Sequence, residues 1–390
     1  MTDRLDALII DESLQEAMQA VFGHSALACF QCGTCTATCP WAVISERPLS
    51  IRELMRRAQL GVDISDDSIW LCTDCGECVE NCPRDVPIPE IIQAWRGWLW
   101  KNQEPEHGLN PILWSIYWNG NPLSQPPSER MNWADGMDVP IFDAEQHEYL
   151  LYVGCTASYD PRAQKTARAL VRLLNEAGWA FGVLGEMERC CGECVLRLGH
   201  KPFFGEIAQA NYEQFVSSGV QKIITISPHC YDVFKNHYPD ASSIEAIHYA
   251  DFLQQALKAG TLTIDRIPDG KMSFHDPCLL SRINPEFEIP REILAHFDGC
   301  VFEELDRSGA DSLCCGGGGG RMFLETLPGE RFSDLRIQSA RERGVQKLVT
   351  TCPLCISCLE DSRAAMGEES LEVMDLAELI ASSIEDPQGD

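Results

Sequence analysis

The C-terminal part of the chain alternates short apolar runs with segments of helical periodicity. Tyr149 to Val153 is an apolar run that predicts a strand. Asp160 and Pro161 then predict the start of a helix, and Gly178 predicts its end. Between these residues the apolar positions recur at helical spacing, at Ala163, Ala167, Leu170, Val171 and Leu174. Strands that alternate with helices in this way predict a parallel sheet with crossover helices.

The N-terminal third shows helical periodicity. Residues 1–28 predict one amphipathic helix. Two further helices are predicted before Gly61 and after Pro89, by Ile51, Leu54, Met55 and Ala58 in the first and by Ile91, Ile92, Trp95 and Trp98 in the second. Residues 101–147 are rich in Pro, Gly and aromatic residues and predict a linker.

An internal repeat divides the rest of the chain into two homologous halves. Cysteines recur at an offset of 123 to 125 positions, with Cys155, Cys190, Cys191 and Cys230 in the first half and Cys278, Cys314, Cys315 and Cys355 in the second. The sequence GVQK also occurs twice, at 219–222 and 344–347. We therefore predict two α/β domains, at residues 148–262 and 263–390. Their cysteines are expected just past the carboxyl ends of strands, where parallel sheets place their ligands.

Composition narrows the function classes. The chain has 390 residues, 45% of them hydrophobic, which suits a soluble protein of two or three domains. Its net charge of −28 disfavours nucleic acid and anionic lipid surfaces, and leaves docking on a basic patch of another protein open. The sequence shows neither a secretory signal nor the roughly 20 apolar residues of a membrane helix. Its 20 cysteines fall in arrays typical of metal sites, so we expect a reducing cytoplasm.

Eight cysteines near the N-terminus form two copies of the run C-x2-C-x2-C-x3-C-P, at Cys29, Cys32, Cys35 and Cys39 and at Cys72, Cys75, Cys78 and Cys82. This spacing is typical of cysteines that hold 4Fe-4S cubanes, with the fourth cysteine of each run crossing to the other cluster. Cys82 is therefore expected to complete the site of the first run, and Cys39 that of the second. Zinc knuckles are the alternative, but zinc sites use C-x2-C pairs with longer gaps. We predict a helical two-cluster domain at residues 29–100 that carries electrons.

The second half of the repeat offers five thiols, at Cys278, Cys314, Cys315, Cys352 and Cys355. Two adjacent cysteines cannot easily both point at one iron of an ordinary cubane. The arrangement therefore indicates a larger, irregular cluster or two shared metals.

These motifs carry a resemblance to a known family. With its two Cys-Cys-Gly segments, HDPC at His275–Cys278, CPLC at Cys352–Cys355 and CCGGGGGRM at Cys314–Met322, the chain resembles the cysteine-rich domains named for Cys-Cys-Gly. It is most similar to heterodisulfide reductase, with the catalytic and ferredoxin-like subunits fused. The resemblance covers nearly everything from residue 25 onward. It implies an α+β multidomain fold, in which a helical two-cluster ferredoxin domain precedes two Rossmann-like α/β domains.

The resemblance also implies chemistry for the second half. Its five cysteines would hold a non-cubane 4Fe-4S cluster, where a disulfide is cleaved in two one-electron steps or electrons are passed on. At Gly316, Gly317 and Gly318, backbone N–H groups are expected to approach the cluster sulfurs. A hinge or a phosphate cradle is the alternative for this glycine run, although no Gly-Lys-Ser/Thr follows it.

The first half departs from this pattern at Ser227, which aligns with Cys352. Four aligned thiols remain, together with a spare, Cys194. Three interpretations stay open: a non-cubane cluster completed by Ser227 or Cys194, a simpler four-thiol cluster or zinc site, and an empty, degenerate half. Four thiols at ligand spacing favour a bound metal.

Histidines beside these cysteines are candidates for proton supply. His275 and Asp276 stand just before Cys278, and His229 occupies the matching neighbourhood in the first half. A role limited to orienting a loop is the alternative. Cys300 and Cys358 fit no motif and are expected to be free and buried. The aromatic residues of the predicted linker indicate either a docking face or packing between domains.

Two functions compete on this scaffold. The first is an oxidoreductase subunit of the heterodisulfide reductase type, which passes electrons from two cubanes to the second-half cluster. The second is a non-catalytic relay, similar to subunits that connect glycolate, lactate or glycerol-3-phosphate dehydrogenases to a quinone-linked membrane partner. A scaffold with structural metals is a third class. No G-x-G-x-x-G follows a predicted strand, so we expect the electron donor to be another protein, with redox subunits as partners.

Overall fold

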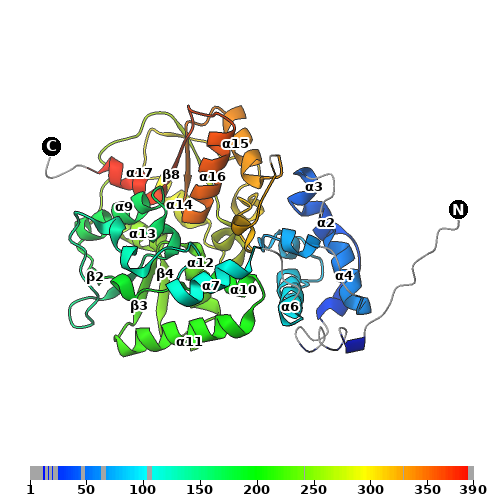
Figure 1. Ribbon diagram of the computed structural model, residues 1–390. Coiled ribbons are helices and arrows are strands. Elements are labelled where there is room, and N and C mark those ends of the chain that lie inside the picture. Colours follow the sequence, from blue (N-terminus) through cyan, green and yellow to red (C-terminus); the bar gives the residue numbers. More distant parts are fainter. Residues whose placement is uncertain are drawn as a thin grey trace, which may run out of the picture. The chain divides into compact units, whose positions relative to one another are not determined.

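The computed structural model describes most of the chain (Figure 1), namely residues 12, 13, 16, 20, 25–44, 49–62, 67–102, 108–240, 242–327 and 329–384. The predicted helix over residues 1–28 lies mostly outside this described part. At its end, Ser25–Ala28 form a short 3-10 turn, η1.

The chain divides into two compact units. The first comprises Met1–Leu109, Cys194–Lys201 and Gly318–Glu330, and the second comprises Asn110–Glu193, Pro202–Gly317 and Arg331–Asp390. The two later segments of the first unit begin within three residues of the two Cys-Cys-Gly motifs, at Cys194 and Gly318. Each motif is therefore followed directly in sequence by a segment that folds with the N-terminal unit.

The first unit is helical, as the sequence predicts. Its elements are α2 Thr34–Thr38, α3 Trp41–Ile44, α4 Ile51–Leu60, η2 Asp67–Leu71, α5 Glu77–Glu80, α6 Ile88–Lys101 and η8 Arg321–Phe323. Ser50 begins α4 by accepting a hydrogen bond from the Glu53 N–H, and Gly61 ends it in the left-handed conformation that glycine tolerates best. The α6 face with Trp95, which is fully buried, supplies much of the unit's core.

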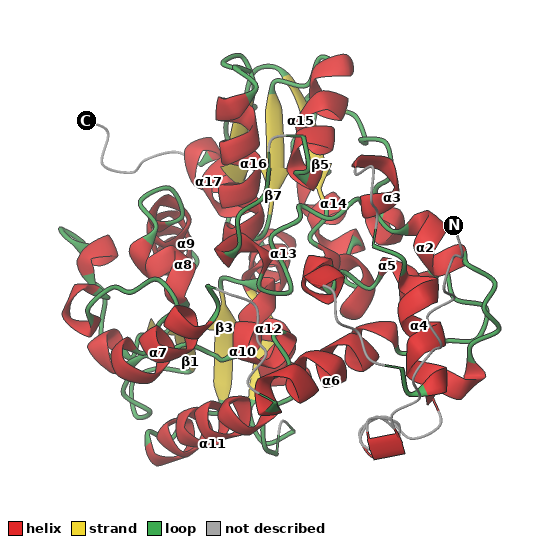
Figure 2. Ribbon diagram, turned by 45° about the vertical axis from the view of Figure 1, so that its right-hand side comes forward, coloured by secondary structure: helices red, strands yellow, loops and turns green. Residues whose placement is uncertain are grey.

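The second unit contains two four-stranded parallel sheets, which confirms the predicted duplication of an α/β fold (Figure 2). The first has the order β2-β1-β3-β4 and the second the order β6-β5-β7-β8. Their bounds are β1 Tyr149–Tyr152, β2 Phe181–Gly182, β3 Lys222–Thr225 and β4 Glu245–His248, then β5 Lys271–His275, β6 Val301–Phe302, β7 Lys347–Thr350 and β8 Glu372–Asp375. The central strands are buried, because helices cover the sheets.

Helices connect the strands in the same order in both halves. The first half has α8 Cys155–Tyr159, α9 Gln164–Glu176, η5 Gly185–Met187, α10 Glu193–Arg197, α11 Lys201–Ser217, α12 Pro228–Asn236 and α13 Tyr249–Ala259. The second has η6 Leu279–Ile283, α14 Glu288–Leu294, η7 Gly309–Asp311, α15 Phe332–Glu342, α16 Pro353–Ala365 and α17 Leu376–Ser383.

The predicted start of the helix after β1 is wrong by a few residues. A short helix, α8, begins at Cys155, and α9 begins at Gln164 rather than after Asp160. Asp160 accepts hydrogen bonds from the N–H groups of Arg162 and Ala163 and so caps the turn that precedes α9. The predicted end is right, since Gly178 adopts positive φ just after α9.

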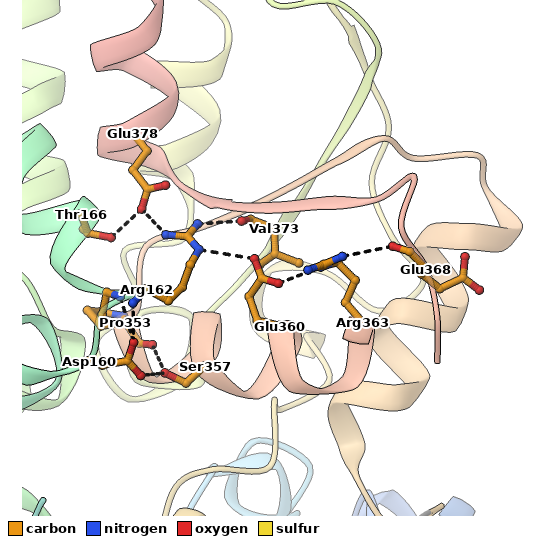
Figure 3. Close-up of polar contacts among 11 residues, drawn as sticks. Asp160, Arg162, Thr166, Pro353, Ser357, Glu360, Arg363, Glu368, Val373 and Glu378 are labelled. Atoms are coloured by element: carbon orange, nitrogen blue, oxygen red, sulfur yellow. Dashed lines mark hydrogen bonds and ion pairs between the residues drawn. The ribbon is translucent and has the colours of Figure 1, made fainter. Parts of the chain in front are cut away.

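The two halves share one hydrophobic core. Residues of α9 and α13 in the first half pack with residues of α17 in the second, including Leu170, Leu253 and Ile380, all of them fully buried. At the edge of this core, Arg162 donates hydrogen bonds to Glu378 at 2.7 Å and to the Val373 carbonyl at 2.7 Å (Figure 3). The duplication therefore forms a single packed body.

The stretch predicted as a linker contains helix α7, Asn110–Asn119, and the 3-10 turns η3 Pro127–Glu129 and η4 Asn132–Ala134. Trp133 is buried in the core of the second unit. The α7 residues Trp114, Tyr117 and Trp118 are mostly exposed. Among the described residues, no helix has both the length and the apolar composition needed to cross a bilayer.

Candidate iron-sulfur centres

The first cysteine run surrounds a cavity in the first unit. The cavity is lined by the three leading cysteines of that run together with one cysteine of the second run, namely Cys29, Cys32, Cys35 and Cys82. This is the set that the crossing pattern predicts for one cubane. The backbone supports it, because Gly33 adopts positive φ and lets α2 begin directly behind Cys32.

The other four N-terminal cysteines also lie close together. The pKa of the Cys78 thiol is raised well above its usual value, first by burial and then by the nearby sulfurs of Cys72, Cys75 and Cys39. All four are buried. Buried thiols that raise one another's pKa do not ionise readily unless a positive charge lies close to them. This set therefore suits a bound cluster that stabilises the thiolates.

The segment that begins at Gly318 packs closely against the backbone of the second cysteine run. A Cβ on Gly318 would come within 2.4 Å of the Thr73 carbonyl oxygen, and one on Gly319 within 2.3 Å of the Cys72 oxygen. These glycines are therefore required for backbone-to-backbone packing in the first unit, a role that the sequence did not predict. In the same glycine run, the Gly316 N–H lies 3.3 Å from the Cys314 sulfur, and an approach of these N–H groups to cluster sulfurs stays a prediction.

The buried side chain of Arg96 ties these segments together. Its guanidinium donates to main-chain carbonyls of three different stretches of the chain, those of Ile69, Cys72, Arg197 and Gly319. Arg197 in turn pairs with Asp74 at 3.2 Å. The residues that follow the two Cys-Cys-Gly motifs are thus fixed to the loop of the second cysteine run by one charged side chain.

The four aligned thiols of the first half lie close together. A hydrogen bond with Cys190, burial and the negative charge of Cys190 raise the pKa of Cys155 well above its usual value. Cys191 hydrogen-bonds with Cys190 and Cys230. As predicted, Cys155 and Cys230 follow the ends of β1 and β3. The spare Cys194 belongs to the first unit.

A buried ion pair supports this first-half site, and no sequence motif indicated it. Arg130 lies 3.7 Å from the Cys155 sulfur and 2.7 Å from Glu188, and both charged side chains are almost fully buried. Glu188 also accepts hydrogen bonds from the N–H groups of Val153 and Gly154. Arg130 therefore brings a fixed positive charge to four thiols whose thiolate forms need one.

In the second half, three thiols and a histidine are drawn together. The sulfurs of Cys315 and Cys355 are 3.4 Å apart. The ligand atoms of His275, Cys315 and Cys355 lie within 4.8 Å of one another. Cys352 hydrogen-bonds with Cys355. Cys314 is buried and Cys278 half-buried, and Cys278 follows the end of β5 as predicted.

A residue of the first half reaches this second-half site. His229, at the start of α12, hydrogen-bonds with Cys352, and its Nδ1 lies 2.9 Å from Glu193. Burial alone would raise the pKa of Cys352, but hydrogen bonds with Cys355 and His229 and the His229 charge lower it to about 5. The two halves therefore meet at the cysteines, and Cys352 is the thiol best prepared to be a thiolate.

The other proposed proton donors differ from each other. His275 is fully buried, and burial together with the charges of Arg336 and Arg282 holds its pKa well below the usual value, so its imidazole is neutral. Asp276 is held by two hydrogen bonds from Arg291, at 2.8 and 3.0 Å. Asp276 also accepts a hydrogen bond from the Gly309 N–H, a contact that the loop-orienting alternative would require.

Cys300 and Cys358 were expected to be buried, and this expectation is wrong, since both are partly exposed. Cys300 packs at the edge of the larger hydrophobic core, and Cys358 packs against the cluster that contains Cys315, Cys352 and Cys355. The donor chemistry of the four sets is uniform, since each offers at least three close thiols, although the first N-terminal set is the more exposed to solvent. Such sets fit iron-sulfur clusters, and the first-half set also fits zinc.

Comparison with protein families agrees with this arrangement. A 4Fe-4S dicluster domain matches residues 25–86, and a cysteine-rich domain matches residues 149–235 and 272–360. Fold, thiol sets and matches define an iron-sulfur electron-transfer protein with two cysteine-rich domains.

Three relatives make the family more specific. The chain is 34% identical over 349 residues to EtfAB:quinone oxidoreductase of Syntrophomonas wolfei, covering 83% of this chain and 47% of that one. It is 30% identical over 402 residues to a probable membrane-anchored ferredoxin of Chromohalobacter salexigens, covering 92% and 60%. It is 30% identical over 390 residues to a subunit of the dihydromethanophenazine:CoB–CoM heterodisulfide reductase of Methanosarcina barkeri, covering 92% and 93%.

The chain belongs to the family of iron-sulfur oxidoreductases that includes this heterodisulfide reductase subunit, which confirms the resemblance seen in its motifs. It spans about half the length of the quinone oxidoreductase and 60% of the ferredoxin.

Proposed function

We propose that the chain is the iron-sulfur subunit of an oxidoreductase of the heterodisulfide reductase type. The two N-terminal thiol sets receive electrons from a redox protein partner, and the second-half site is where a disulfide reacts. The disulfide takes up two electrons and two protons and leaves as two thiols, so its S–S bond breaks and two S–H bonds form. The chain would work in a reducing cytoplasm, joined to a membrane complex through a partner.

One observation carries this proposal, the contrast between the two halves at a single aligned position. The second half keeps a complete set of five thiols, with Cys352 held as a low-pKa sulfur by His229 and Cys355. The first half has Ser227 there, and its hydroxyl accepts a hydrogen bond from the His229 N–H. A serine used as a helix cap leaves the first half with four thiols, so the five-thiol chemistry belongs to the second half.

The residues of the second-half site have separable roles. Cys278, Cys314, Cys315, Cys352 and Cys355 would hold a non-cubane 4Fe-4S cluster, which supplies one-electron chemistry and affinity for substrate sulfur. The half-buried Cys278 marks the side that a substrate reaches. His275, whose Nδ1 has no hydrogen-bond partner among the described residues, would face the substrate as a neutral imidazole and donate a hydrogen bond to a departing sulfur.

A relay between a flavoprotein and a quinone-linked membrane partner is the second candidate. Its specific support is burial, since four of the five second-half thiols are nearly inaccessible, Cys314, Cys315, Cys352 and Cys355. A relay needs no substrate at this site. The similarity to EtfAB:quinone oxidoreductase favours the same role.

Reoxidation of the reduced protein separates the two candidates. Protein purified without oxygen is first assayed for iron, labile sulfide and low-temperature EPR signals, then reduced photochemically and mixed with small disulfides or with a soluble quinone. Bleached cluster absorbance should return with a disulfide and yield two thiols per disulfide. Recovery with quinone alone would support the relay and contradict disulfide reduction.

A further inference from the structure

The two N-terminal thiol sets differ in their access to solvent. In the first set Cys32 is exposed and Cys29 and Cys82 are half-buried. In the second set Cys39, Cys72, Cys75 and Cys78 are all buried. Because electron transfer between proteins slows steeply with distance, a partner gains most by docking where the first set reaches the surface.

An exposed aromatic side chain lies beside this opening. Phe30 lines the same cavity as Cys29 and Cys32 and is 68% exposed. The Arg84 guanidinium lies over its ring, 4.5 Å from the centroid. Leu27, three residues earlier in sequence, is 52% exposed. Aromatic residues and arginines are the residue types enriched in protein interfaces, and here they meet at the edge of a proposed redox centre.

The charge at this opening is opposite to that of the whole chain. Among the described residues that line the cavity, the charged ones are Arg52 and Arg84. Arg56 lies one helical turn after Arg52 on α4, and like charges at this spacing weaken a helix slightly. No carboxylate of the described residues pairs with any of these three arginines, and all three are exposed. A local basic patch is unexpected in a chain of net charge −28.

We propose that Phe30, Arg52, Arg56 and Arg84 form the docking surface for an acidic electron-carrier protein, which delivers electrons to the first thiol set. This proposal rests on the proposed electron-transfer function and adds the place and the charge of the partner. The net negative charge of the chain is screened beyond about 8 Å at physiological salt, so the local arginines decide the interaction at contact. An acidic partner is favoured here and repelled over the rest of the surface.

Binding of the oxidised holoprotein to flavodoxin, an acidic one-electron carrier, tests this surface. Affinity is measured by calorimetry between about 20 and about 300 mM salt, a range chosen to vary charge screening. The wild type should bind and lose affinity at least about tenfold across this range. Arg52→Glu with Arg84→Glu should weaken binding at low salt at least about tenfold, whereas Arg52→Lys with Arg84→Lys should largely retain it.

The matched control makes the same change of charge elsewhere. Lys165→Glu with Lys201→Glu alters two exposed lysines that do not line the cavity, and it should leave binding nearly unchanged. Iron and labile-sulfide content must be equal in all variants. Weaker binding can then be attributed to the changed surface rather than to loss of an iron-sulfur cluster. Phe30→Ala should weaken binding a few-fold without changing the salt dependence.

Three outcomes would overturn the proposal: no flavodoxin binding at low salt, equal binding by the doubly reversed variant, or equal loss in the lysine control. Anionic phosphatidylserine vesicles are tested in parallel, and vesicle binding that requires Arg52 and Arg84 would assign the patch to a membrane surface instead. Because no disulfide or quinone is present, these results do not depend on which reaction the second-half site performs.

Discussion

The two halves of the second unit have the same sheet and place their cysteines at the same strand ends, yet they build different sites. The clearest difference is at Ser227 and Cys352, which both stand immediately before the helix that follows the third strand. Ser227 uses its hydroxyl to accept the His229 N–H and so caps α12. Cys352 makes no such cap, and its sulfur instead contacts Cys355 and His229. One side chain is used by the helix, and the other is available to the site.

The surroundings differ in charge as well. The first-half thiols have the buried Arg130 beside them, held by Glu188. The second-half thiols have the neutral His275, with the charges of Arg336 and Arg282 near it, and the titratable His229, which belongs to the first half and whose charge lowers the Cys352 pKa. The first half therefore offers a fixed cation that suits a permanent, structural or relay metal. The second offers hydrogen-bond donors and a fifth sulfur, which suit a centre whose ligands change during a reaction.

Removing an aligned cysteine from each half should give the largest effect. Cys355→Ala is expected to remove the second-half cluster, with loss of roughly four iron atoms per chain, and to lower disulfide reduction by more than ~100-fold, since even residues behind the ligands cost 10–100-fold. Cys230→Ala should remove only the first-half metal. Iron analysis and EPR of both variants check this. Equal loss of the second-half signal in both would show that the halves do not load independently.

Exchanging the residues at the aligned position tests the comparison directly. Cys352→Ser gives the second half the donor set of the first, so the EPR signal of the second-half centre should change and disulfide reduction should fall at least ~10-fold. Ser227→Cys offers the first half a fifth thiol. The control is Cys358→Ser, the same substitution within the helix that Cys352 precedes, which should change neither property. An unchanged signal in Cys352→Ser would remove Cys352 from the ligand set.

Much of this architecture could be predicted from the sequence, because it depends on local patterns. Apolar periodicity predicted the strands and helices, their alternation predicted the parallel sheets, and the cysteine offsets predicted the duplication. The start of α9 was misplaced because Asp160 caps a turn as readily as a helix.

Contacts made only by the folded chain could not be predicted. Arg130 and Glu188 are 58 positions apart and belong to no motif. The contact of His229 with Cys352 joins two separate repeats. Gly318 was assigned to a cluster because it follows Cys315, whereas the packing of Gly318 and Gly319 against Thr73 and Cys72 depends on backbone approach in three dimensions. Spacing identifies ligands, but it does not identify the charges that surround them.

Arg130→Met should weaken metal binding at the first-half site specifically. The change removes the cation beside Cys155 and leaves the buried Glu188 with only backbone donors. Loss of one member of a buried ion pair typically lowers the free energy of unfolding by about 3–5 kcal/mol. We expect faster release of first-half metal to a chelator and a lower melting temperature. Arg130→Met with Glu188→Gln should restore the melting temperature but not the metal retention. Restoration of both would mean that the pair is purely structural.

His229→Leu should affect the second half, although His229 belongs to the first. Losing the hydrogen bond to Cys352 removes positive potential from that sulfur, so the second-half centre should become harder to reduce, by on the order of tens of millivolts. Potentiometric EPR titration measures this shift. His237→Leu, at the end of the same helix, is the control and should leave the potential unchanged. A shift in the first-half centre alone would contradict the cross-half contact.

The smallest effect is expected at two aligned carboxylates in the first turns of α13 and α17, Asp251 and Glu378. Glu378 binds Arg162 and Thr166 (Figure 3), whereas Asp251 has one buried carboxylate oxygen without a partner among the described residues. Burial and the charge of Glu286 raise the Asp251 pKa to about 6. Since the folded state then holds a proton that the unfolded state has lost, stability falls as pH rises from about 4 to 6 and stays lower above it.

Asp251→Asn should therefore raise the melting temperature at pH 8 by roughly 2 °C, equivalent to about 1 kcal/mol once partial exposure is allowed for, and the gain should disappear near pH 4. Glu378→Gln should instead lower the melting temperature by a similar amount at pH 8, because it weakens the contact with Arg162 that joins the halves. Calorimetric scans at both pH values check the signs. If both substitutions destabilised the protein equally at pH 8, ionisation of Asp251 would not lower the stability of the fold. The difference inferred between the starts of α13 and α17 would then be wrong.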